Sequence, residues 1–215
     1  MCEVNINDDH AFPFQHFGND WDYCEPINFQ ELTKFTRNSV SYVHLNCRSI
    51  SSNWESFYDL ICSLHYEYVS FDCMDVNEVF NCDKDLRLAL PGFHKLITRS
   101  CKDDNHGGVR LFIKQNVQYK NREDLSVFIP SIFDSLFIEV LSNTNKNTII
   151  VVIYRRNTQP KADIDIFTST LFDLMNIISV EEIKSTIMGD FNIDLLKYNS
   201  RDKTNNYVDN LFTQR

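Results

Sequence analysis

A regular pattern of apolar and polar residues begins at Val40 and predicts the ordered part of the chain. Residues 40–46 (VSYVHLN) send successive side chains to opposite faces, which predicts a strand. Residues 1–38 show no sustained period, and we expect them to form a loosely ordered arm before a domain at 39–215. Further strands are predicted at residues 68–74, 93–99, 109–114, 135–141, 148–154 and 185–189, with a loop at 81–92 and a hairpin turn at 142–147 (SNTNKN).

Two amphipathic helices are predicted from apolar residues that recur every three or four positions. One covers residues 53–66, where Ser52 and Glu55 have the spacing of a capping box. The other runs through Ile164, Phe167, Leu171, Leu174 and Ile178, with Asp163 as its expected cap. A further short helix is predicted at 205–212. Strands outnumber helices, so the sequence favours an α+β layered fold in which sheets pack together and helices cover the outside.

The stretch STIMGDFNID (185–194) raises the question of function, because an apolar run ends at a glycine and then alternates polar and apolar residues. Asp190, Asn192 and Asp194 match the first three ligand positions of a calcium loop. The sixth position of such a loop is glycine and the twelfth is glutamate, but here they are Leu195 and Arg201. The calcium interpretation therefore fails. A polar loop start and a site at the end of a strand both remain open.

Other predicted strands also end in polar groups, namely Asn46, Glu78 and Tyr154. If these strands share a sheet edge, their ends bring carboxylates, amides and a phenol together. Carboxylate and amide oxygens suit a hard cation such as Mg²⁺. A second carboxylate beside an amide can orient and deprotonate a water molecule. This grouping favours a site at the strand end over an ordinary loop.

Composition and charge restrict the function classes. The net charge is −9, which argues against a protein that holds nucleic acid mainly through bulk positive charge. The charge does not exclude an enzyme that uses a divalent cation on a phosphodiester. The seven cysteines include no Cys-x-x-Cys pair, and the sequence has neither a secretory signal nor an apolar run of about 20 residues. We therefore expect an intracellular protein without a membrane span.

Five sequence blocks occur in the order seen in endonuclease/exonuclease/phosphatase proteins. They are LNCRSI (45–50), NEVF (77–80), GGVRLFIK (107–114), VVIYRR (151–156) and MGDFNIDLL (188–196). Together they most resemble the apurinic-endonuclease-like domain of non-LTR retrotransposons. The resemblance implies a four-layered α/β sandwich of two packed, mainly antiparallel sheets flanked by helices. It also implies Mg²⁺- or Mn²⁺-dependent hydrolysis of DNA phosphodiesters in the nucleus, without a small-molecule cofactor, and it allows a downstream reverse transcriptase as a partner.

The resemblance assigns a role to several residues. Asp190 resembles the aspartate that activates the attacking water, and Asn192 the amide beside it that holds the phosphate. Tyr154 matches the phenol that faces the scissile phosphate. Asn46 looks like the amide that supports the metal and the phosphate. Asp194 is expected to cap the loop rather than to act in catalysis.

The sequence matches the family pattern less closely at the metal-binding carboxylate and at the residues expected to contact DNA. Glu78 resembles the metal-binding glutamate, but it stands in DVNEVF, so Asp75 is an alternative for the aligned carboxylate. Arg155 and Arg156 replace prolines that are common at these positions. The two arginines are expected either to contact DNA phosphates or to lie in solvent.

The sequence departs from the family at its end. Family members carry a Ser-Asp-His block several dozen residues beyond the Gly-Asp-x-Asn motif, and an earlier aspartate on a strand. No Asp-His pair follows Asp190, and the only one in the chain is Asp9-His10. We therefore expect a C-terminally truncated fold and a weak or inactive nuclease. A catalytically inactive remnant, or a cellular phosphodiesterase or phosphatase of the same superfamily, remains an alternative.

Overall fold

The structure is a computed structural model of the 215-residue chain. It describes residues 14–15, 21–22, 40–46, 49–66, 71–77, 88–99, 108–142, 146–157 and 160–193. The description that follows concerns these residues.

Two sheets form the centre of the fold. The four-stranded sheet has the order β3 (Tyr42–Asn46), β4 (Cys73–Asn77), β6 (Val109–Ile113) and β5 (Ile97–Arg99). The five-stranded sheet has the order β11 (Lys184–Asp190), β10 (Thr148–Arg155), β9 (Phe133–Val140) and β7 (Tyr119–Asn121), and β8 (Phe128–Ile129) also pairs with β9. A short ribbon pairs β1 (Phe14–Gln15) with β2 (Trp21–Asp22).

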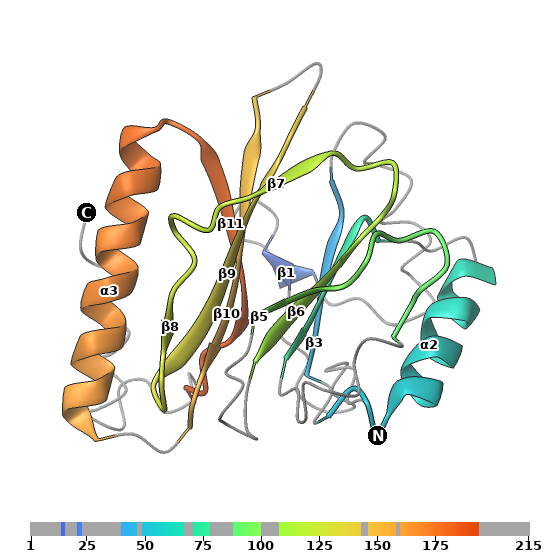
Figure 1. Cartoon of the computed structure of the whole chain (residues 1–215), viewed down its shortest axis with the longest axis horizontal. Coiled ribbons are helices and arrows are strands. Elements are labelled where there is room, and N and C mark those ends of the chain that lie inside the picture. Colours follow the sequence, from blue (N-terminus) through green and yellow to red (C-terminus); the bar gives the residue numbers. More distant parts are fainter. Residues whose placement is uncertain are drawn as a thin grey trace.

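The helices lie on the outside, so the described part of the chain has four layers (Figure 1). Helix α3 (Lys161–Val180) covers the five-stranded sheet, and helix α2 (Trp54–Tyr66) covers the four-stranded sheet. Most strand pairs are antiparallel, but β3 and β4 are parallel, and so are β10 and β11. Each sheet therefore has one edge where two strands end in the same direction.

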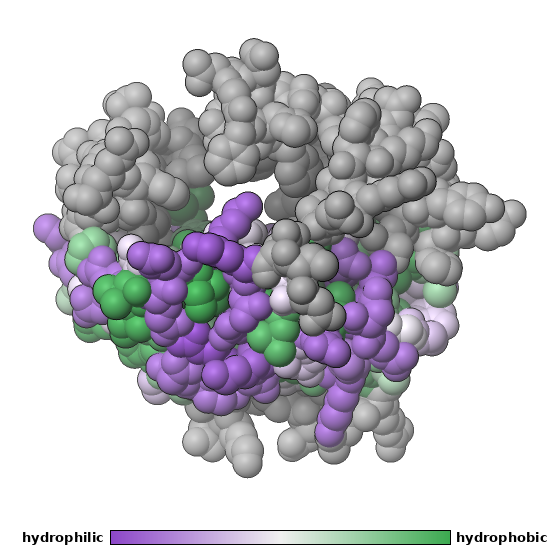
Figure 2. All heavy atoms as spheres, turned by 90° about the horizontal axis from the view of Figure 1, so that it is seen from above, coloured by the Kyte–Doolittle hydropathy of each residue, from purple (hydrophilic) through white to green (hydrophobic). Residues whose placement is uncertain are grey.

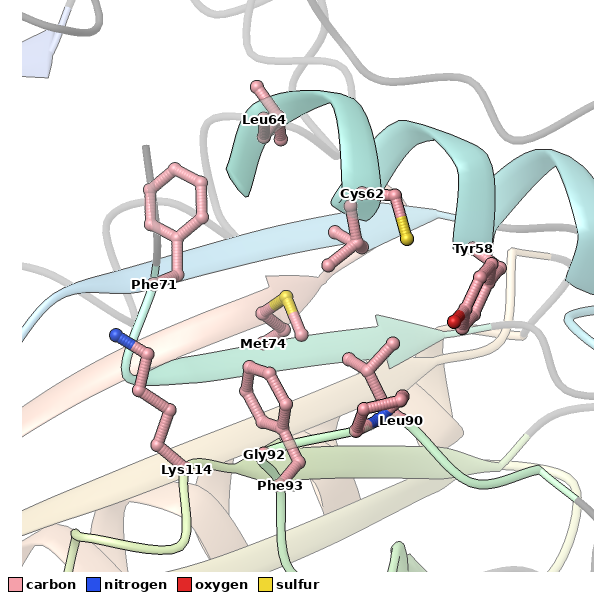
Figure 3. A pocket seen from close by; sticks show the side chains of 11 residues that line it. Tyr58, Cys62, Leu64, Phe71, Met74, Leu90, Gly92, Phe93 and Lys114 are labelled. Atoms are coloured by element: carbon pink, nitrogen blue, oxygen red, sulfur yellow. The ribbon is translucent and has the colours of Figure 1, made fainter. Parts of the chain in front are cut away.

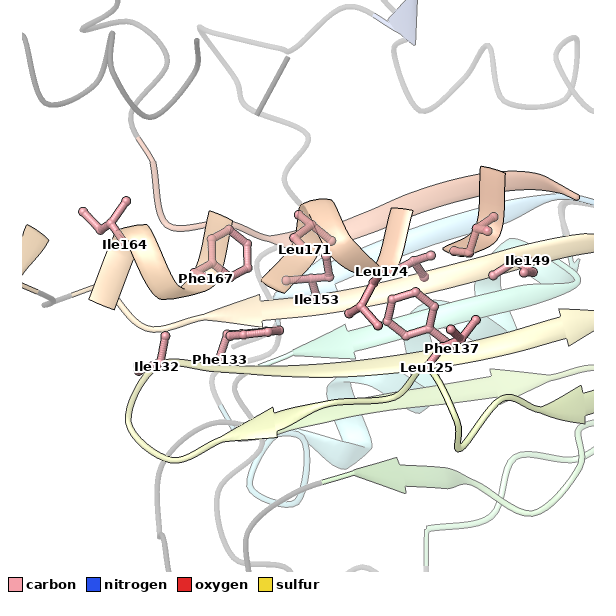
Figure 4. Close-up of a cluster of buried hydrophobic side chains, with 12 residues drawn as sticks. Leu125, Ile132, Phe133, Phe137, Ile149, Ile153, Ile164, Phe167, Leu171 and Leu174 are labelled. Carbon is pink, nitrogen blue, oxygen red and sulfur yellow. The ribbon is translucent and has the colours of Figure 1, made fainter. Parts of the chain in front are cut away.

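Apolar side chains fill the three spaces between the layers. Phe167, Leu171 and Leu174 of α3 pack against Phe133 and Ile153 of the five-stranded sheet (Figure 4). The space between the sheets contains a second cluster, which includes Leu111 and Val152, and α2 packs Phe57 onto Phe112 in a third. Figure 2 shows a face of the molecule on which the described residues are mostly hydrophilic, with scattered apolar patches.

The structure confirms the predicted fold class and most of the predicted elements. Helix α3 buries Ile164, Phe167, Leu171, Leu174 and Ile178, which are the residues whose spacing predicted it. The β9–β10 pair is antiparallel around residues 142–147, as the hairpin prediction requires. The two short strands β7 and β8 were not predicted, because three residues and two residues are too few to show a period.

Some predicted boundaries were wrong. Strand β4 continues to Asn77 rather than ending at residue 74, because the side chains of Asp75 and Asn77 find polar partners inside the fold. Helix α3 begins at Lys161 with Pro160 at its N-cap, so Asp163 lies in the first turn and is not the cap. There its carboxylate still faces the positive end of the helix dipole. The predicted strand 93–99 is a strand only at Ile97–Arg99, with an isolated bridge at Phe93.

Three sequence predictions fall outside the described residues. They are the metal-binding role of Glu78, the loop-capping role of Asp194 and the helix at 205–212. In the described ranges, no helix combines the length and the apolar character needed to cross a membrane.

A buried arginine joins α3 to the five-stranded sheet. Arg122, which follows β7, is 5% exposed. Its Nη2 atom lies 2.7 Å from Asp124 Oδ2 and 2.6 Å from Glu181 Oε1, at the end of α3. Its Nη1 atom lies 3.6 Å from Oε2 of Glu139 in β9. Hydrogen bonds from Arg122 lower the pKa of the Asp124 and Glu181 carboxyls below their ordinary values.

We predict that Arg122→Ala lowers the free energy of unfolding by about 3 kcal/mol, because it leaves the nearly buried Glu139 without its cation. Arg99 is a matched control, since its partner Glu123 is 67% exposed. Arg99→Ala should cost less than about 1 kcal/mol. Urea unfolding of the two variants and the wild type measures both effects.

The cost of Arg122→Ala should also depend on pH. Both carboxyls have folded pKa values below their unfolded values, so their contribution is present above the unfolded pKa and is lost as the pH falls through the folded pKa. The difference between wild type and variant should therefore shrink in acid. A difference that stays constant from neutral to acidic pH would contradict this account of the cluster.

Candidate active site

The site lies where the edge strands of the two sheets, β3 and β11, run beside each other. The Tyr42 side chain of β3 lies beside the Thr186 side chain of β11, and burial raises the pKa of Tyr42 to about 12. Four residues further along both strands, Asn46 Nδ2 donates to Asp190 Oδ2 at 3.2 Å. Because both strands advance by the same number of residues between these contacts, their carboxyl ends meet at one place.

Both oxygens of the Asp190 carboxylate accept a hydrogen bond. Asn46 donates to Oδ2, and the backbone N–H of Asn192 donates to Oδ1 at 2.8 Å. These contacts fix the carboxylate at the last residue of β11. Each carboxylate oxygen can accept more than one hydrogen bond, so both retain the capacity to bind a further donor such as water.

The turn after Asp190 is held by Arg155. Asn192 has a left-handed backbone conformation (φ 48°), which asparagine tolerates better than most residues. Its side-chain amide donates to the carbonyl of Arg155, whose guanidinium donates to the carbonyls of Phe191 and Asn192 at 2.7 Å each. Arg155 is only 4% exposed. The Arg155 guanidinium thus contacts the backbone of the turn, and its predicted contact with DNA stays a prediction.

Tyr154 lies beside Asp190 in the sheet. The parallel register of β10 and β11 pairs Tyr154 with Asp190, and paired residues of neighbouring strands present their side chains on the same face. Tyr154 is 8% exposed and belongs to the cluster between the two sheets. The phenol and the carboxylate therefore both face the junction.

Glycine is required next to Asp190. Gly189 has φ 133°, and a Cβ atom there would lie 1.9 Å from the carbonyl oxygen of Ile153 in β10. The backbones of β10 and β11 thus approach too closely at this point for any side chain on residue 189. The same register pairs the next residue, Asp190, with Tyr154.

On β3, two residues before Asn46, a histidine forms a pair with a buried carboxylate that the sequence analysis missed. His44 Nδ1 lies 2.6 Å from Asp75 Oδ2, across the parallel register of β3 and β4. Burial raises the pKa of the fully buried Asp75 carboxyl. Burial alone would lower the pKa of His44, but the charges of Asp75 and Asp190 raise it above its ordinary value.

Asn77 completes the polar inner face of the four-stranded sheet. Its Nδ2 donates to the carbonyl of Ile153 at 3.0 Å, which is a second hydrogen bond between the sheets. Its Oδ1 and Asp75 Oδ1 are buried and have no hydrogen-bond partner among the described residues. Unpaired buried oxygens are costly and rare in folded proteins. Their presence next to the Asn46–Asp190 contact indicates a site that holds further polar groups.

The donors at the junction fit a hard cation in chemical type, because they are carboxylate and amide oxygens. The described residues contain no cluster of three or more His, Cys, Asp or Glu side chains that could hold a metal ion. The predicted ligand Glu78 follows directly after Asn77, the last residue of β4, and lies outside the described ranges. The metal role of Glu78 therefore stays a prediction. Asp75, the alternative carboxylate, is paired with His44.

The structure thus brings four of the predicted catalytic residues to one junction: Asn46, Tyr154, Asp190 and Asn192. The sequence did contain a signal for His44, because it shares a strand face with Asn46 two residues later. Its partner Asp75 is 31 residues away and becomes a neighbour only through strand pairing.

An apolar pocket of about 310 Å³ lies on the other side of the four-stranded sheet, between α2 and the sheet (Figure 3). Met74 and Phe93 line it, with Tyr58 from α2 and the Lys114 ammonium at its edges. Among the residues that the structure describes, no carboxylate lines this pocket. The pocket is therefore separate from the junction that holds Asp190.

Comparisons with solved structures find the same fold. A humanized zebrafish (D. rerio) TDP2 has a TM-score of 0.53 at 16% identity, over 80% of this chain and 70% of that one. An endonuclease/exonuclease/phosphatase family protein from Bacteroides thetaiotaomicron has a TM-score of 0.55 at 14% identity, over 81% and 67%. The 3′ phosphatase NExo from Neisseria, bound to a product DNA hairpin, has a TM-score of 0.54 at 14% identity, over 81% and 71%.

Neither a protein-family model nor a curated protein matches the sequence of the chain. The three structures are each less than 25% identical to it, so they establish a shared fold alone.

We predict that Gly189→Ala lowers the free energy of unfolding by about 3 kcal/mol or more, because the added Cβ meets the Ile153 carbonyl and the backbone is strained. Gly92 is the matched control, since it also has a positive φ of 82° but has nothing within 4 Å of an added Cβ. Gly92→Ala should cost about 1 kcal/mol from strain alone. Equal losses for both variants in thermal or urea unfolding would contradict the close approach of β10 and β11.

Proposed function

We propose that this chain, which has the fold of endonuclease/exonuclease/phosphatase proteins, hydrolyses phosphodiester bonds in DNA with the help of Mg²⁺ or Mn²⁺. The observation that carries the proposal is the hydrogen bond from Asn46 to Asp190, which joins residues 144 positions apart at the ends of two sheets. The sequence resemblance further favours a DNA-nicking endonuclease of the non-LTR retrotransposon type.

Asp190 is suited to activate water. Its carboxylate is oriented by two donors and lies beside the Tyr154 position in the sheet. In the proposed reaction, Asp190 accepts a proton from a water molecule, whose oxygen attacks phosphorus. The bond from phosphorus to the 3′ oxygen breaks, and this oxygen takes up a proton, which leaves a 3′ hydroxyl and a 5′ phosphate. Tyr154 and the Asn192 amide supply polar contacts to the phosphate oxygens.

Asn46 and Glu78 would hold the divalent cation, since an amide oxygen and a carboxylate are ligands that Mg²⁺ accepts. When bound, the cation neutralises charge on the phosphate as it is attacked. Asn46 also donates to Asp190, so one side chain would link the metal to the residue that activates water.

DNA is the proposed substrate although the chain is acidic overall. A net charge of −9 makes long-range attraction of DNA weak, so binding must depend on local contacts. Arg156 is partly exposed and directly follows Arg155, the last residue of β10, beyond the Tyr154–Asp190 pair. We propose that Arg156 contacts the DNA backbone and that Arg155, which is buried, holds the turn that positions Asn192.

We predict that the chain nicks supercoiled plasmid slowly in the presence of Mg²⁺ or Mn²⁺, as expected for a weak nuclease. Asp190→Asn should lower this rate by a further factor of about 10²–10⁴, since an amide cannot accept the proton. Asp173→Asn, on the exposed side of α3, is a control that should nick at the wild-type rate. Gel analysis of nicked plasmid, with EDTA as the metal-free condition, measures the rates.

Two results would contradict the proposal. One is the absence of metal-dependent nicking by the 215-residue chain, which would favour an inactive remnant. The other is an unchanged rate for Asp190→Asn. Faster hydrolysis of nucleotide or lipid phosphomonoesters than of plasmid DNA would instead favour a phosphatase of the same fold.

We predict that Arg156→Gln weakens binding to a short DNA duplex and reduces the slope of log affinity against log salt by about 1, as expected for the loss of one phosphate contact. Lys184→Gln is the matched control, because Lys184 is exposed at the opposite end of β11 from Asp190. Fluorescence anisotropy at several salt concentrations measures both. Equal effects of the two variants would show that Arg156 contributes only general charge.

A further inference from the structure

The apolar pocket between α2 and the four-stranded sheet is a concave site apart from the junction of β3 and β11. Met74 of β4 lines it, whereas the next residue, Asp75, points toward the junction, because neighbouring side chains of a strand lie on opposite faces. Its volume of about 310 Å³ is at the lower end of the range of small-molecule sites, about 300–1,000 Å³. Since one water molecule occupies about 30 Å³ in the liquid, the pocket has room for on the order of ten non-hydrogen atoms.

The packing of α2 explains why this space is present. Near the start of the helix, the rings of Trp54 and Phe57 pack against Phe112 of the sheet, with centroids 6.1 and 5.6 Å apart. Further along the helix, the aliphatic side chains of Ile61 and Leu64 line the pocket instead. An apolar space left empty costs stability, and such spaces take up small apolar molecules.

The lining of the pocket is apolar except at its ends. Figure 3 shows Met74 in the middle, with the Tyr58 phenol at one end and the Lys114 ammonium at the other. Among the residues that the structure describes, Lys114 is the only charged side chain that lines the pocket. An occupant that matches this lining has an apolar body and one negative end.

The Lys114 ammonium has donors left for such an occupant. Its Nζ lies 3.3 Å from Asp72 Oδ1, which is longer than a typical charge-assisted hydrogen bond. Asp72 Oδ2 is already held by the backbone N–H and the hydroxyl of Ser41, at 2.9 and 2.8 Å. An ammonium group has three N–H donors, and Asp72 takes one of them. The Lys114 side chain is 25% exposed, so its other donors are accessible.

We propose that this pocket binds a small amphiphilic carboxylate, namely a medium-chain fatty acid. The apolar chain lies against Met74 and Phe93, and the carboxylate accepts hydrogen bonds from Lys114. Burial of the chain supplies most of the affinity, and Lys114 selects a negative head group over a neutral or positive one. The proposal is independent of the function proposed above, because it uses none of the residues at the junction.

The first experiment is an NMR titration of the full chain, labelled at its methionine methyl groups, with octanoate. Met74 lines the pocket, whereas Met175 packs in the cluster beneath α3 and Met188 packs between the sheets. We expect the Met74 signal, identified by its loss in Met74→Leu, to shift with a dissociation constant on the order of 0.1–1 mM. The Met175 and Met188 signals should stay in place. A Met74 signal that shifts no more than that of Met188 overturns the proposal.

The second experiment tests the head group with 1-octanol and octylamine, which have the same chain. The wild type should bind octanoate about fivefold more tightly than octanol, and octylamine most weakly, because Lys114 attracts only the carboxylate. Lys114→Met should remove the preference for octanoate with little effect on octanol. Lys120→Met is the matched control, since Lys120 is exposed on β7 of the other sheet, and it should retain the preference.

Asp72→Asn tests Lys114 from the opposite direction. Asp72 competes with the ligand for the ammonium, so its neutralisation should strengthen octanoate binding by about twofold to fivefold and leave octanol binding unchanged. The asparagine retains an oxygen that can accept from Ser41. Thermal unfolding checks that each variant is folded.

The outcomes decide the ligand class without any measurement of DNA cleavage. Equal affinity of the wild type for octanoate and octanol overturns the carboxylate as the ligand, even where the Met74 signal shifts. An unchanged preference in Lys114→Met, or weaker octanoate binding by Asp72→Asn, overturns the role of Lys114. Failure of the proposed nuclease function leaves these results unaffected, because octanoate binding is measured without DNA or metal.

Discussion

The hydrogen bond between Asn46 and Asp190 is the contact on which the candidate site depends. It joins the last residue of β3 to the last residue of β11, and the Tyr42–Thr186 contact repeats the same alignment four residues earlier. The apolar packing between the two sheets is not directional, so it does not by itself select one alignment of the strand ends. These polar contacts require one particular alignment, and they lie at the end where both pairs of parallel strands terminate.

This alignment places polar groups where an apolar layer would otherwise continue. Asp75, Asn77 and Tyr154 all lie between the sheets, next to residues such as Val152 and Leu111. Burying such groups costs free energy unless they find partners. Some of the cost is met by the contacts of Asp75 with His44 and of Asn77 with Ile153. The remaining unpaired oxygens are what we expect of a site that is completed by a ligand.

Local patterns in the sequence were sufficient for the outer layers and for the identity of several site residues. Helix α3 follows from its apolar spacing, and Asp190 and Asn192 stand out because they follow an apolar strand and a glycine. The burial of Arg155 and the His44–Asp75 contact could not be predicted in this way. Both depend on which strands become neighbours, and that is decided by packing between segments far apart in the chain. The end of β4 was misplaced for the same reason, since Asp75 and Asn77 resemble loop residues until their partners are known.

The central claim is that the junction of β3 and β11 binds a divalent cation for catalysis. Anomalous diffraction from crystals of the full chain grown with Mn²⁺ tests it most directly. The account predicts one strong anomalous peak in contact with the Asn46 side chain, beside Asp190, and its loss in an Asn46→Ala crystal. A well-ordered junction without a peak, or Mn²⁺ bound only elsewhere, would contradict the account.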